Sequence, residues 1–259
     1  SFRRLAKAAA WVLCAGFFVM ISSPAAASTP VDPAPAHWQE LTPEQRLADL
    51  HHRRRSSLEN NLQAAGFSLG SPAFIRVFKE SSELELWLQK PGAAAFEPWR
   101  TYAIAKWSGT LGPKQKEGDG QAPEGFYSVA RQRLNPGSKY HLSFNIGYPN
   151  AYDLAHGCTG GLIMVHGKNV SIGCFAMTDP VIEEIYLIVE AALAAGQAQV
   201  PVHSFPFRLT EERLAQARAE GSPWVEFWST GLRPAWQAFE QTHMPPTVRQ
   251  GLRYEVEAR

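Results

Sequence analysis

The sequence predicts a mainly β fold with flanking helices, centred on a curled mixed β-sheet or sandwich, and three observations favour it. Short apolar runs separated by Gly and Pro fill residues 73–146, which is typical of strands and turns. Segments with helical spacing of apolar residues lie before and after this stretch. Finally, 45% of the 259 residues are hydrophobic and 11% are aromatic, which is enough for a sizeable core.

Residues 1–27 have the pattern of a secretory signal peptide. A basic start precedes an apolar stretch over residues 8–21, and three alanines before Ser28 resemble a cleavage site. The apolar stretch is short for a membrane span, although an uncleaved membrane anchor stays open as the alternative. Residues 28–43 are rich in Pro and Ala and are expected to be a linker. The sequence therefore predicts an exported protein.

An N-terminal helix is expected within residues 44–70. Thr42-Pro43 is a typical helix start, leucines recur at helical spacing, and Gly66 ends the pattern. The run from His51 to Arg55 lies inside this helix and either contacts acidic groups of a partner or forms a solvated face. We favour the solvated face, because charge runs on helices usually point to water.

Residues 71–205 are predicted to form the main domain. A helix is expected over residues 180–195, with Asp179 as its N-cap and Pro180 in the first position. Two apolar runs around a Lys-Glu-Ser-Ser turn indicate a hairpin. The expected strands are residues 73–78, 84–88, 101–107, 125–130, 140–146 and 199–205.

A helical extension is predicted over residues 206–259. Its two helices are expected over residues 210–220 and roughly 224–241. The second carries a stripe of Trp and Phe residues, which we expect to pack against the core, with a wall of the substrate cleft as the alternative.

Charge and motif content exclude several function classes. The formal net charge is +1 and the longest basic run is three residues, which argues against a nucleic-acid partner. The sequence has no zinc-type ligand spacing and no Gly-rich phosphate loop, so neither a metal site nor a cofactor is predicted. Asp119 and Glu124 resemble the carboxylate pair of a glycosidase, but the Gly and Pro residues around them favour an exposed loop.

Residues 161–177, GLIMVHGKNVSIGCFAM, carry the strongest candidate chemistry. We expect two short strands joined as an antiparallel hairpin, which would bring His166 and Cys174 to the same end of a sheet. A thiol needs a base to become a reactive thiolate, and His166 is the candidate base. The Gly167 carbonyl could fix the imidazole tautomer, and Gly173 could let the backbone approach a substrate where amides stabilise an oxyanion. A buried cysteine beside a structural histidine stays open as the simpler alternative.

Four further residues are candidate substrate contacts. The run NIGYPNAYDLAHG is polar, aromatic and turn-rich, as expected of a loop that lines a cleft, and it supplies Asn145, Tyr148 and His156. For His156 we favour a role in ordering the loop over a role as a second base. Ser171 is the fourth candidate. Basic residues that could bind substrate carboxylates, although each is more often exposed to solvent, are Arg131, Arg133, Lys139 and Lys168.

Export bears on the state of the cysteines. Beyond the predicted signal segment the chain has only Cys158 and Cys174. An oxidising compartment tends to pair two cysteines, and pairing would inactivate the proposed nucleophile. We expect Cys158 to stay free, and a redox-controlled pair stays open.

The stretch from Tyr140 to Asp179 resembles the catalytic core of the L,D-transpeptidase catalytic (YkuD-type) family, in particular its YafK-like branch of peptidoglycan–lipoprotein amidases. Residues 118–129 are similar to the family segment that leads into a core strand. Ile172 stands where the general family pattern has a second histidine, and this departure fits the YafK-like branch.

The resemblance implies an L,D-transpeptidase-type fold and a periplasmic cysteine enzyme of the cell wall. It implies that Cys174 attacks an amide carbonyl at the L-centre of diaminopimelate in a peptidoglycan stem peptide and forms a thioester. In the YafK-like branch it implies hydrolysis of the link to a lipoprotein or outer-membrane protein. An L,D-transpeptidase that forms cross-links or attaches proteins, an L,D-carboxypeptidase, another cysteine hydrolase and a non-catalytic wall-binding module stay open.

Overall fold

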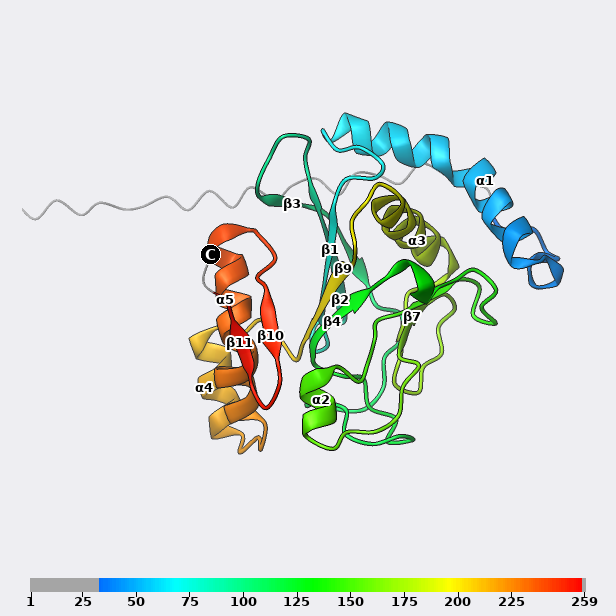
Figure 1. Cartoon of the computed structure of the whole chain (residues 1–259). Helices are drawn as coiled ribbons and strands as arrows, with labels where there is room; N and C mark the ends of the chain where they lie inside the picture. The colour runs from blue at the N-terminus through cyan, green and yellow to red at the C-terminus, as the bar shows by residue number, and fades with distance from the viewer. Residues whose placement is uncertain (1–32, 258–259) are drawn as a thin grey trace, which may run out of the picture. The chain divides into compact units, whose positions relative to one another are not determined.

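The computed structural model describes residues 33–257, which belong to one compact unit. The predicted signal peptide and the first part of the predicted linker lie outside the described residues. A five-stranded sheet lies between helices on both faces, and a smaller sheet packs beside it (Figure 1). The predicted class, mainly β with flanking helices, is confirmed.

The five-stranded sheet is mixed. Strand β1 pairs in parallel with β9 and in antiparallel with β2, while β2 with β3 and β4 with β9 are antiparallel. The spatial order is β3-β2-β1-β9-β4. The strand bounds are Ala73–Phe78 for β1, Glu83–Gln89 for β2, Phe96–Ala103 for β3, Gly125–Val129 for β4 and Val200–Phe205 for β9.

Strand β1 is buried on both faces, which explains its nearly continuous apolar sequence. Alternate residues belong to different core clusters, because successive side chains point to opposite faces. Ile75 and Val77 belong to the cluster that includes buried residues of the segment 182–193, whereas Phe74 packs against Phe239 in the C-terminal region.

The smaller sheet has the order β5-β6-β7-β8. Its strands are Leu134–Asn135, Ser143–Asn145, Met164–His166 and Phe175–Ala176. Strands β7 and β8 are parallel, so the predicted antiparallel hairpin is wrong. After His166 the chain leaves the sheet, because the Gly167 amide donates to the carbonyls of Tyr140 and Leu142 and the Lys168 amide donates to Asp179. It then returns to run alongside β7 in the same direction.

Helix α1 (Pro43–Ala64) has the predicted start, since Thr42 and Gln45 form a reciprocal capping box. The predicted solvated face is wrong for two of its arginines. Arg53 and Arg54 have side chains only 8% and 9% exposed, and they contact Glu183 at 2.8 and 3.3 Å. Glu183 is buried on the helix Asp179–Ala194. A buried carboxylate is costly without a paired cation, and the two arginines provide that charge.

Helix α3 (Asp179–Ala194) covers one face of the large sheet and packs against α1. Its N-cap residue is Thr178 rather than the predicted Asp179. The Asp179 carboxylate instead accepts a hydrogen bond of 2.7 Å from the Lys168 amide, outside the helix. The cap prediction therefore missed by one residue because Asp179 has a longer-range partner. A short helix, α2 (Ala151–Ala155), was not predicted.

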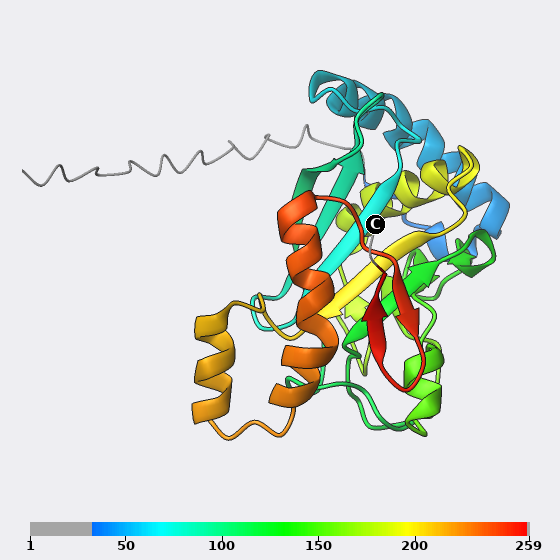
Figure 2. The ribbon, with the colours of Figure 1, turned by 60° about the vertical axis from the view of Figure 1, so that its left-hand side comes forward.

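The C-terminal region contains α4 (Glu211–Ala219), a π-helical segment (Phe227–Leu232), α5 (Arg233–Thr242) and an unpredicted hairpin of β10 (Val248–Gln250) and β11 (Tyr254–Val256). The predicted single helix is thus interrupted, next to a proline in the first turn of α5. Helix α5 and the hairpin lie against the sheet on the face opposite α3 (Figure 2). Trp228 and Phe239 are buried, which confirms that the aromatic stripe packs on the core.

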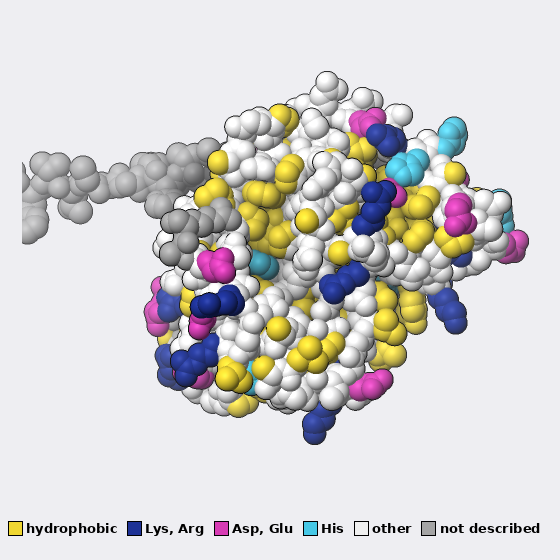
Figure 3. All heavy atoms as spheres, in the orientation of Figure 1, with side chains coloured by type: hydrophobic (Ala, Val, Ile, Leu, Met, Phe, Trp, Pro, Cys, Tyr) yellow, Lys and Arg dark blue, Asp and Glu magenta, His cyan; other side chains and the backbone are white. Residues whose placement is uncertain are grey.

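Surface charge is dispersed on the face shown in Figure 3. Lys and Arg side chains there are scattered among apolar and acidic groups and form no continuous basic track on that face. Within residues 33–257, no helix is both long and apolar enough to span a bilayer.

Candidate active site

Strand pairing places Cys174 and His166 on one face of the smaller sheet. Val165 pairs with Phe175 and His166 with Ala176, so Cys174 lies beside Met164. Met164 and His166 point to the same face, because side chains alternate along a strand. Given the usual strand spacing and rise, the Cα atoms of His166 and Cys174 are roughly 8 Å apart. The two side chains therefore face the same space. Parallel pairing of two strands brings them together, and not the predicted hairpin.

The thiol of Cys174 is half-buried and hydrogen-bonded to backbone. The Met164 amide donates to Sγ at 3.4 Å, and Sγ lies 3.7 Å from the Leu162 carbonyl, which can accept the thiol hydrogen. Among residues 33–257, no hydrogen bond joins the thiol directly to the His166 ring. Catalytic contacts are often loose without substrate and tighten when it binds.

His166 has a fixed tautomer. Its Nδ1 lies 2.6 Å from the Gly167 carbonyl oxygen. Because a carbonyl oxygen can only accept, Nδ1 carries the hydrogen and Nε2 keeps its lone pair. His166 as a residue is 3% exposed, and its ring lies against Tyr140, with ring centroids 4.8 Å apart. The predicted contact from the Gly167 carbonyl is present, and it leaves a basic nitrogen in the imidazole.

Burial makes both groups neutral at rest. It lowers the pKa of His166, an effect that the hydrogen bond to Gly167 partly offsets. Burial also raises the pKa of Cys174, while the Met164 amide and the Lys114 charge oppose that rise. At neutral pH the site therefore holds a thiol and an unprotonated imidazole, which is the pair needed for general-base activation.

Both predicted glycines occupy positions that a side chain could not share. A Cβ on Gly167 would lie 2.6 Å from the Asp179 carboxylate and 2.8 Å from the Tyr140 carbonyl. Gly173 has a φ of +116°, which disfavours other residues, and a Cβ there would lie 3.3 Å from the Gln121 carbonyl. The backbone before the thiol thus passes close to the loop that contains Gln121.

Of the predicted substrate contacts, Asn145 lies in the same row of the sheet as the thiol. Asn145 on β6 pairs with Met164 on β7. Cys174 lies beside Met164 on the other side of β7. The Asn145 side chain accepts a 2.7 Å hydrogen bond from the Gly147 amide. A substrate lying across this row would pass over both residues.

The other three candidates have structural partners. Tyr148 is buried, and its hydroxyl lies 3.3 Å from the carbonyls of both Lys114 and Thr159. The Ser171 hydroxyl donates to the Cys174 carbonyl at 2.7 Å and accepts from the Gly173 amide, so it shapes the turn before the thiol. His156 is exposed at the end of α2 and stacks on Tyr152 at 4.0 Å. Roles in substrate binding stay predictions for all three.

The suspected carboxylate pair divides into two different environments. Asp119 lies in an exposed loop as expected, but Glu124 is fully buried, so the exposed-loop prediction is wrong for Glu124. Its carboxylate pairs with Lys79 at 2.9 Å and accepts from the Trp228 indole at 2.6 Å. The basic residues considered as carboxylate binders are all exposed: Arg131, Arg133, Lys139 and Lys168.

Sequence reasoning missed Lys114. It is 4% exposed, and its positive charge opposes the rise in the pKa of the Cys174 thiol that burial causes. It lies in a Gly-rich, polar segment that resembles an exposed turn, and its burial depends on residues distant in sequence. Cys158 and Cys174 are both free thiols in the structure. Within the described part of the chain, no cluster of His, Cys, Asp or Glu could hold a metal ion.

Comparison with known proteins finds a matching family, two relatives and similar solved structures. Residues 86–203 match the YkuD family, the L,D-transpeptidase catalytic domain. Two proteins named "Putative L,D-transpeptidase YafK", from two strains of Escherichia coli, are each 47% identical over 180 residues, which covers 70% of this chain and 71% of each relative. The crystal structure of the helical cell shape determining protein Pgp2 from Campylobacter jejuni is 22% identical, with a TM-score of 0.41, over 70% of this chain and 68% of that one.

Proposed function

Because this chain belongs to the L,D-transpeptidase catalytic domain family and is an enzyme that acts on peptidoglycan, we propose that Cys174 is its nucleophile and His166 its general base. We further propose that the reaction is hydrolysis of the amide that links a lipoprotein or outer-membrane protein to the L-centre of diaminopimelate. The observation that carries the proposal is the fixed tautomer of His166, which leaves Nε2 without a hydrogen in a side chain that shares a sheet face with Cys174.

The proposed mechanism has two halves. Nε2 of His166 takes the thiol proton while Sγ attacks the amide carbonyl, and the proton then passes to the departing amine as the C–N bond breaks. The products of this half are the free amine and a thioester on Cys174. In the second half His166 takes a proton from water, hydroxide adds to the thioester, and the thiol leaves with the proton.

Backbone amides offer a place for the oxyanion. The Gly173 amide already donates to the Ser171 hydroxyl at 3.2 Å. The Cys174 amide has no acceptor within residues 33–257. We propose that this amide stabilises the negative oxygen of the tetrahedral intermediate, a contact that is typically worth about 3–4 kcal/mol of barrier in cysteine and serine enzymes.

The acceptor decides between hydrolysis and transpeptidation, because both reactions share the thioester. An amine acceptor would give L,D-transpeptidation, and removal of a terminal residue would be L,D-carboxypeptidase activity. We propose a periplasmic location, with residues 1–27 as the signal peptide and residues 71–205 as the catalytic domain. The proposed partners are a stem peptide and the protein attached to it.

Mass spectrometry of peptidoglycan that carries covalently linked lipoprotein would test the proposal. We expect the protein-linked muropeptide to disappear on incubation with the full chain, and to persist with Cys174→Ala. His166→Ala should slow the loss by about 10²–10⁴-fold, the usual contribution of a general base. Cys158→Ser is the matched control and should behave like the wild type. Full activity of Cys174→Ala would refute the nucleophile, and a gain of cross-linked dimers would instead identify a transpeptidase.

A further inference from the structure

Tyr140 contacts the proposed general base with both its ring and its backbone. The centroid of its ring lies 4.8 Å from that of the His166 ring, with 42° between the two ring planes. Its carbonyl accepts a 3.0 Å hydrogen bond from the amide of Gly167, whose own carbonyl fixes Nδ1 of His166. One residue therefore contacts both the imidazole and the peptide that sets its tautomer.

The two rings differ in their access to solvent. Tyr140 is 43% exposed, whereas His166 is 3% exposed. Because an exposed ring packs on a buried one, Tyr140 covers part of the imidazole that water would otherwise reach. The Tyr140 hydroxyl has no hydrogen-bond partner among residues 33–257. The ring of Tyr140, rather than its hydroxyl, is therefore the part that acts on His166.

The loop of residues 136–141, here called the 136–141 loop, carries Tyr140 and is held by helix α1. The buried guanidinium of Arg46 on α1 donates to three carbonyls of this loop, at 3.3, 2.8 and 3.4 Å: those of Pro136, Ser138 and His141. Arg46 is 4% exposed and lies before residues 86–203, which match the catalytic domain family. A segment outside the family match thus fixes the loop that covers the base.

His141, the residue after Tyr140, is held from two sides. Its φ is +72°, a left-handed conformation that is uncommon for a residue with a side chain. Trp38 stacks on its ring with the centroids 4.4 Å apart, and its Nε2 lies 2.9 Å from the Glu183 carboxylate. These contacts offset the cost of the backbone conformation. They also fix the direction in which the chain brings Tyr140 to His166.

The charge of His166 changes during the proposed reaction. At rest, burial lowers the pKa of His166 and the hydrogen bond with Gly167 opposes that shift. Titratable groups on the elements around this pair include Lys168 after β7, Cys174 before β8, His141 in the 136–141 loop, and Asp179 and Glu183 on α3. The face of an aromatic ring attracts a cation within about 6 Å of its centroid, and Tyr140 meets this distance.

We propose that Tyr140 is a positioning residue for His166 and that Arg46 holds the 136–141 loop in the conformation that this role needs. The tyrosine ring covers the imidazole and stabilises the imidazolium that forms when His166 takes the thiol proton. The inference rests on the proposed function in taking His166 as the general base. It makes helix α1 a part of the catalytic machinery.

An NMR titration of the His166 ring in the full chain would test this inference, with the signal identified by its loss in His166→Gln. Tyr140→Leu keeps an apolar cover but removes the aromatic face, and we expect the pKa of His166 to fall by about 0.4–0.7 unit. Tyr140→Phe keeps the ring and should leave this pKa unchanged. Tyr140→Ala removes the cover, so relief of desolvation should raise the pKa.

The matched control is Tyr152→Leu, which removes the ring that stacks on His156 with the centroids 4.0 Å apart. It should leave the His166 titration unchanged. Arg46→Met removes the donors that hold the 136–141 loop, and we expect it to raise the pKa of His166 as Tyr140→Ala does. Tyr140 is exposed, so its variants decide the inference if Arg46→Met does not fold.

Turnover of the protein-linked muropeptide gives a second measurement. Tyr140→Leu should lower kcat by about 2–5-fold with KM unchanged, because the imidazolium of the transition state loses its aromatic neighbour. Tyr140→Phe should retain the wild-type kcat. A merely structural tyrosine would not give this division between the two variants.

Three outcomes would overturn the inference. An unchanged pKa of His166 in Tyr140→Leu would show that the ring gives no stabilisation, and an equal shift in Tyr140→Phe would assign the effect to the hydroxyl. An unchanged pKa in Arg46→Met would remove α1 from the site. Retained hydrolysis in Cys174→Ala would refute the proposed function instead, and the NMR titration, which needs no turnover, distinguishes the two failures.

Discussion

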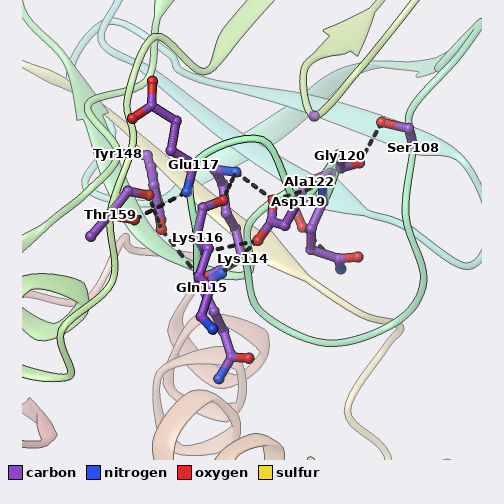
Figure 4. Close-up of polar contacts among 12 residues, drawn as sticks. Ser108, Lys114, Gln115, Lys116, Glu117, Asp119, Gly120, Ala122, Tyr148 and Thr159 are labelled. Carbon is purple, nitrogen blue, oxygen red and sulfur yellow. Dashed lines mark hydrogen bonds and ion pairs between the residues drawn. The ribbon is translucent and has the colours of Figure 1, made fainter.

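Two buried lysines contact the loop of residues 108–122, and their surroundings differ. Lys79 pairs with Glu124 at 2.9 Å, and both side chains are 0% exposed. Lys114 pairs with Asp119, whose side chain is 24% exposed (Figure 4). Desolvation is the largest influence on Lys79 and lowers its pKa, with Glu124 opposing the shift. The first pair is sealed in the interior, and the second lies at its edge.

The sealed pair connects three parts of the fold. Lys79 follows β1 and donates to the carbonyls of Gly112 and Ala122, at 2.8 and 3.0 Å. Glu124 accepts from the Gly112 amide and from the Trp228 indole in the C-terminal region. Removing any member leaves a buried charge without its partner, which is costly. The difference teaches that the enclosed pair joins distant segments of the fold, whereas the partly open pair orders its own loop.

The largest expected effect is on the sealed pair. Lys79→Met leaves the Glu124 carboxylate buried without a cation, and we expect the free energy of unfolding to fall by about 3–5 kcal/mol. Urea denaturation at pH 7 measures this. The matched control is Lys90→Met, which breaks the surface pair with Glu97 and should cost at most about 1 kcal/mol. Equal losses for the two variants would contradict the distinction between sealed and open pairs.

A smaller loss is expected when only the indole hydrogen bond is removed. Trp228→Phe keeps an aromatic ring but leaves one oxygen of Glu124 without its donor. Hydrogen bonds to charged groups contribute about 1.5–3 kcal/mol, and some packing is lost as well. Urea denaturation should give a loss in this range. Trp236→Phe is a useful control, because the Trp236 indole nitrogen has no hydrogen-bond partner within residues 33–257.

The edge pair should contribute little to stability. We expect Lys114→Gln to lower the free energy of unfolding by about 1 kcal/mol or less, since Asp119 keeps its backbone donors and some access to water. Thermal and urea unfolding measure this. A loss as large as that of Lys79→Met would erase the difference between the two lysines.

The last effect concerns acid stability. The folded-state pKa of Asp119 is about 2, below its ordinary value of 3.8, so its contribution to stability is present above pH 3.8 and is lost as the pH falls towards 2. The stability difference between wild type and Asp119→Asn should therefore shrink over that interval. Urea denaturation at pH 5, 4, 3 and 2 measures it. A difference that stays constant would show that the carboxylate has an ordinary pKa in the folded chain.

The elements predicted best from sequence are those whose signals are local. Strand β1 was predicted with its observed bounds, because six consecutive buried positions give a continuous apolar run. The start of α1 was predicted because Thr42 and Pro43 are adjacent capping residues. His166, Cys174 and the Gly167 carbonyl could be proposed together because they lie within nine consecutive positions.

The elements predicted poorly depend on distant partners. Strands β7 and β8 have three and two residues, too few for a periodic pattern to reveal their parallel direction. Glu124 is buried against Lys79 and Trp228, and Trp228 lies 104 positions away. The Gly- and Pro-rich sequence around Glu124 therefore did not indicate a buried carboxylate. Lys114 was missed for the same reason. The C-terminal hairpin is held by Tyr254, which stacks on Tyr152 and receives a hydrogen bond from Asn150.

The indole of Trp228 has a practical consequence for anyone who shortens this protein. A fragment ending at residue 205 would contain every residue assigned to acyl transfer, yet Glu124 would lose a donor and Gly125 would lose the neighbouring hydroxyl of Tyr254. Low turnover by such a fragment would reflect a displaced loop rather than a missing chemical group. The last fifty residues are better regarded as part of the enzyme than as a removable appendage.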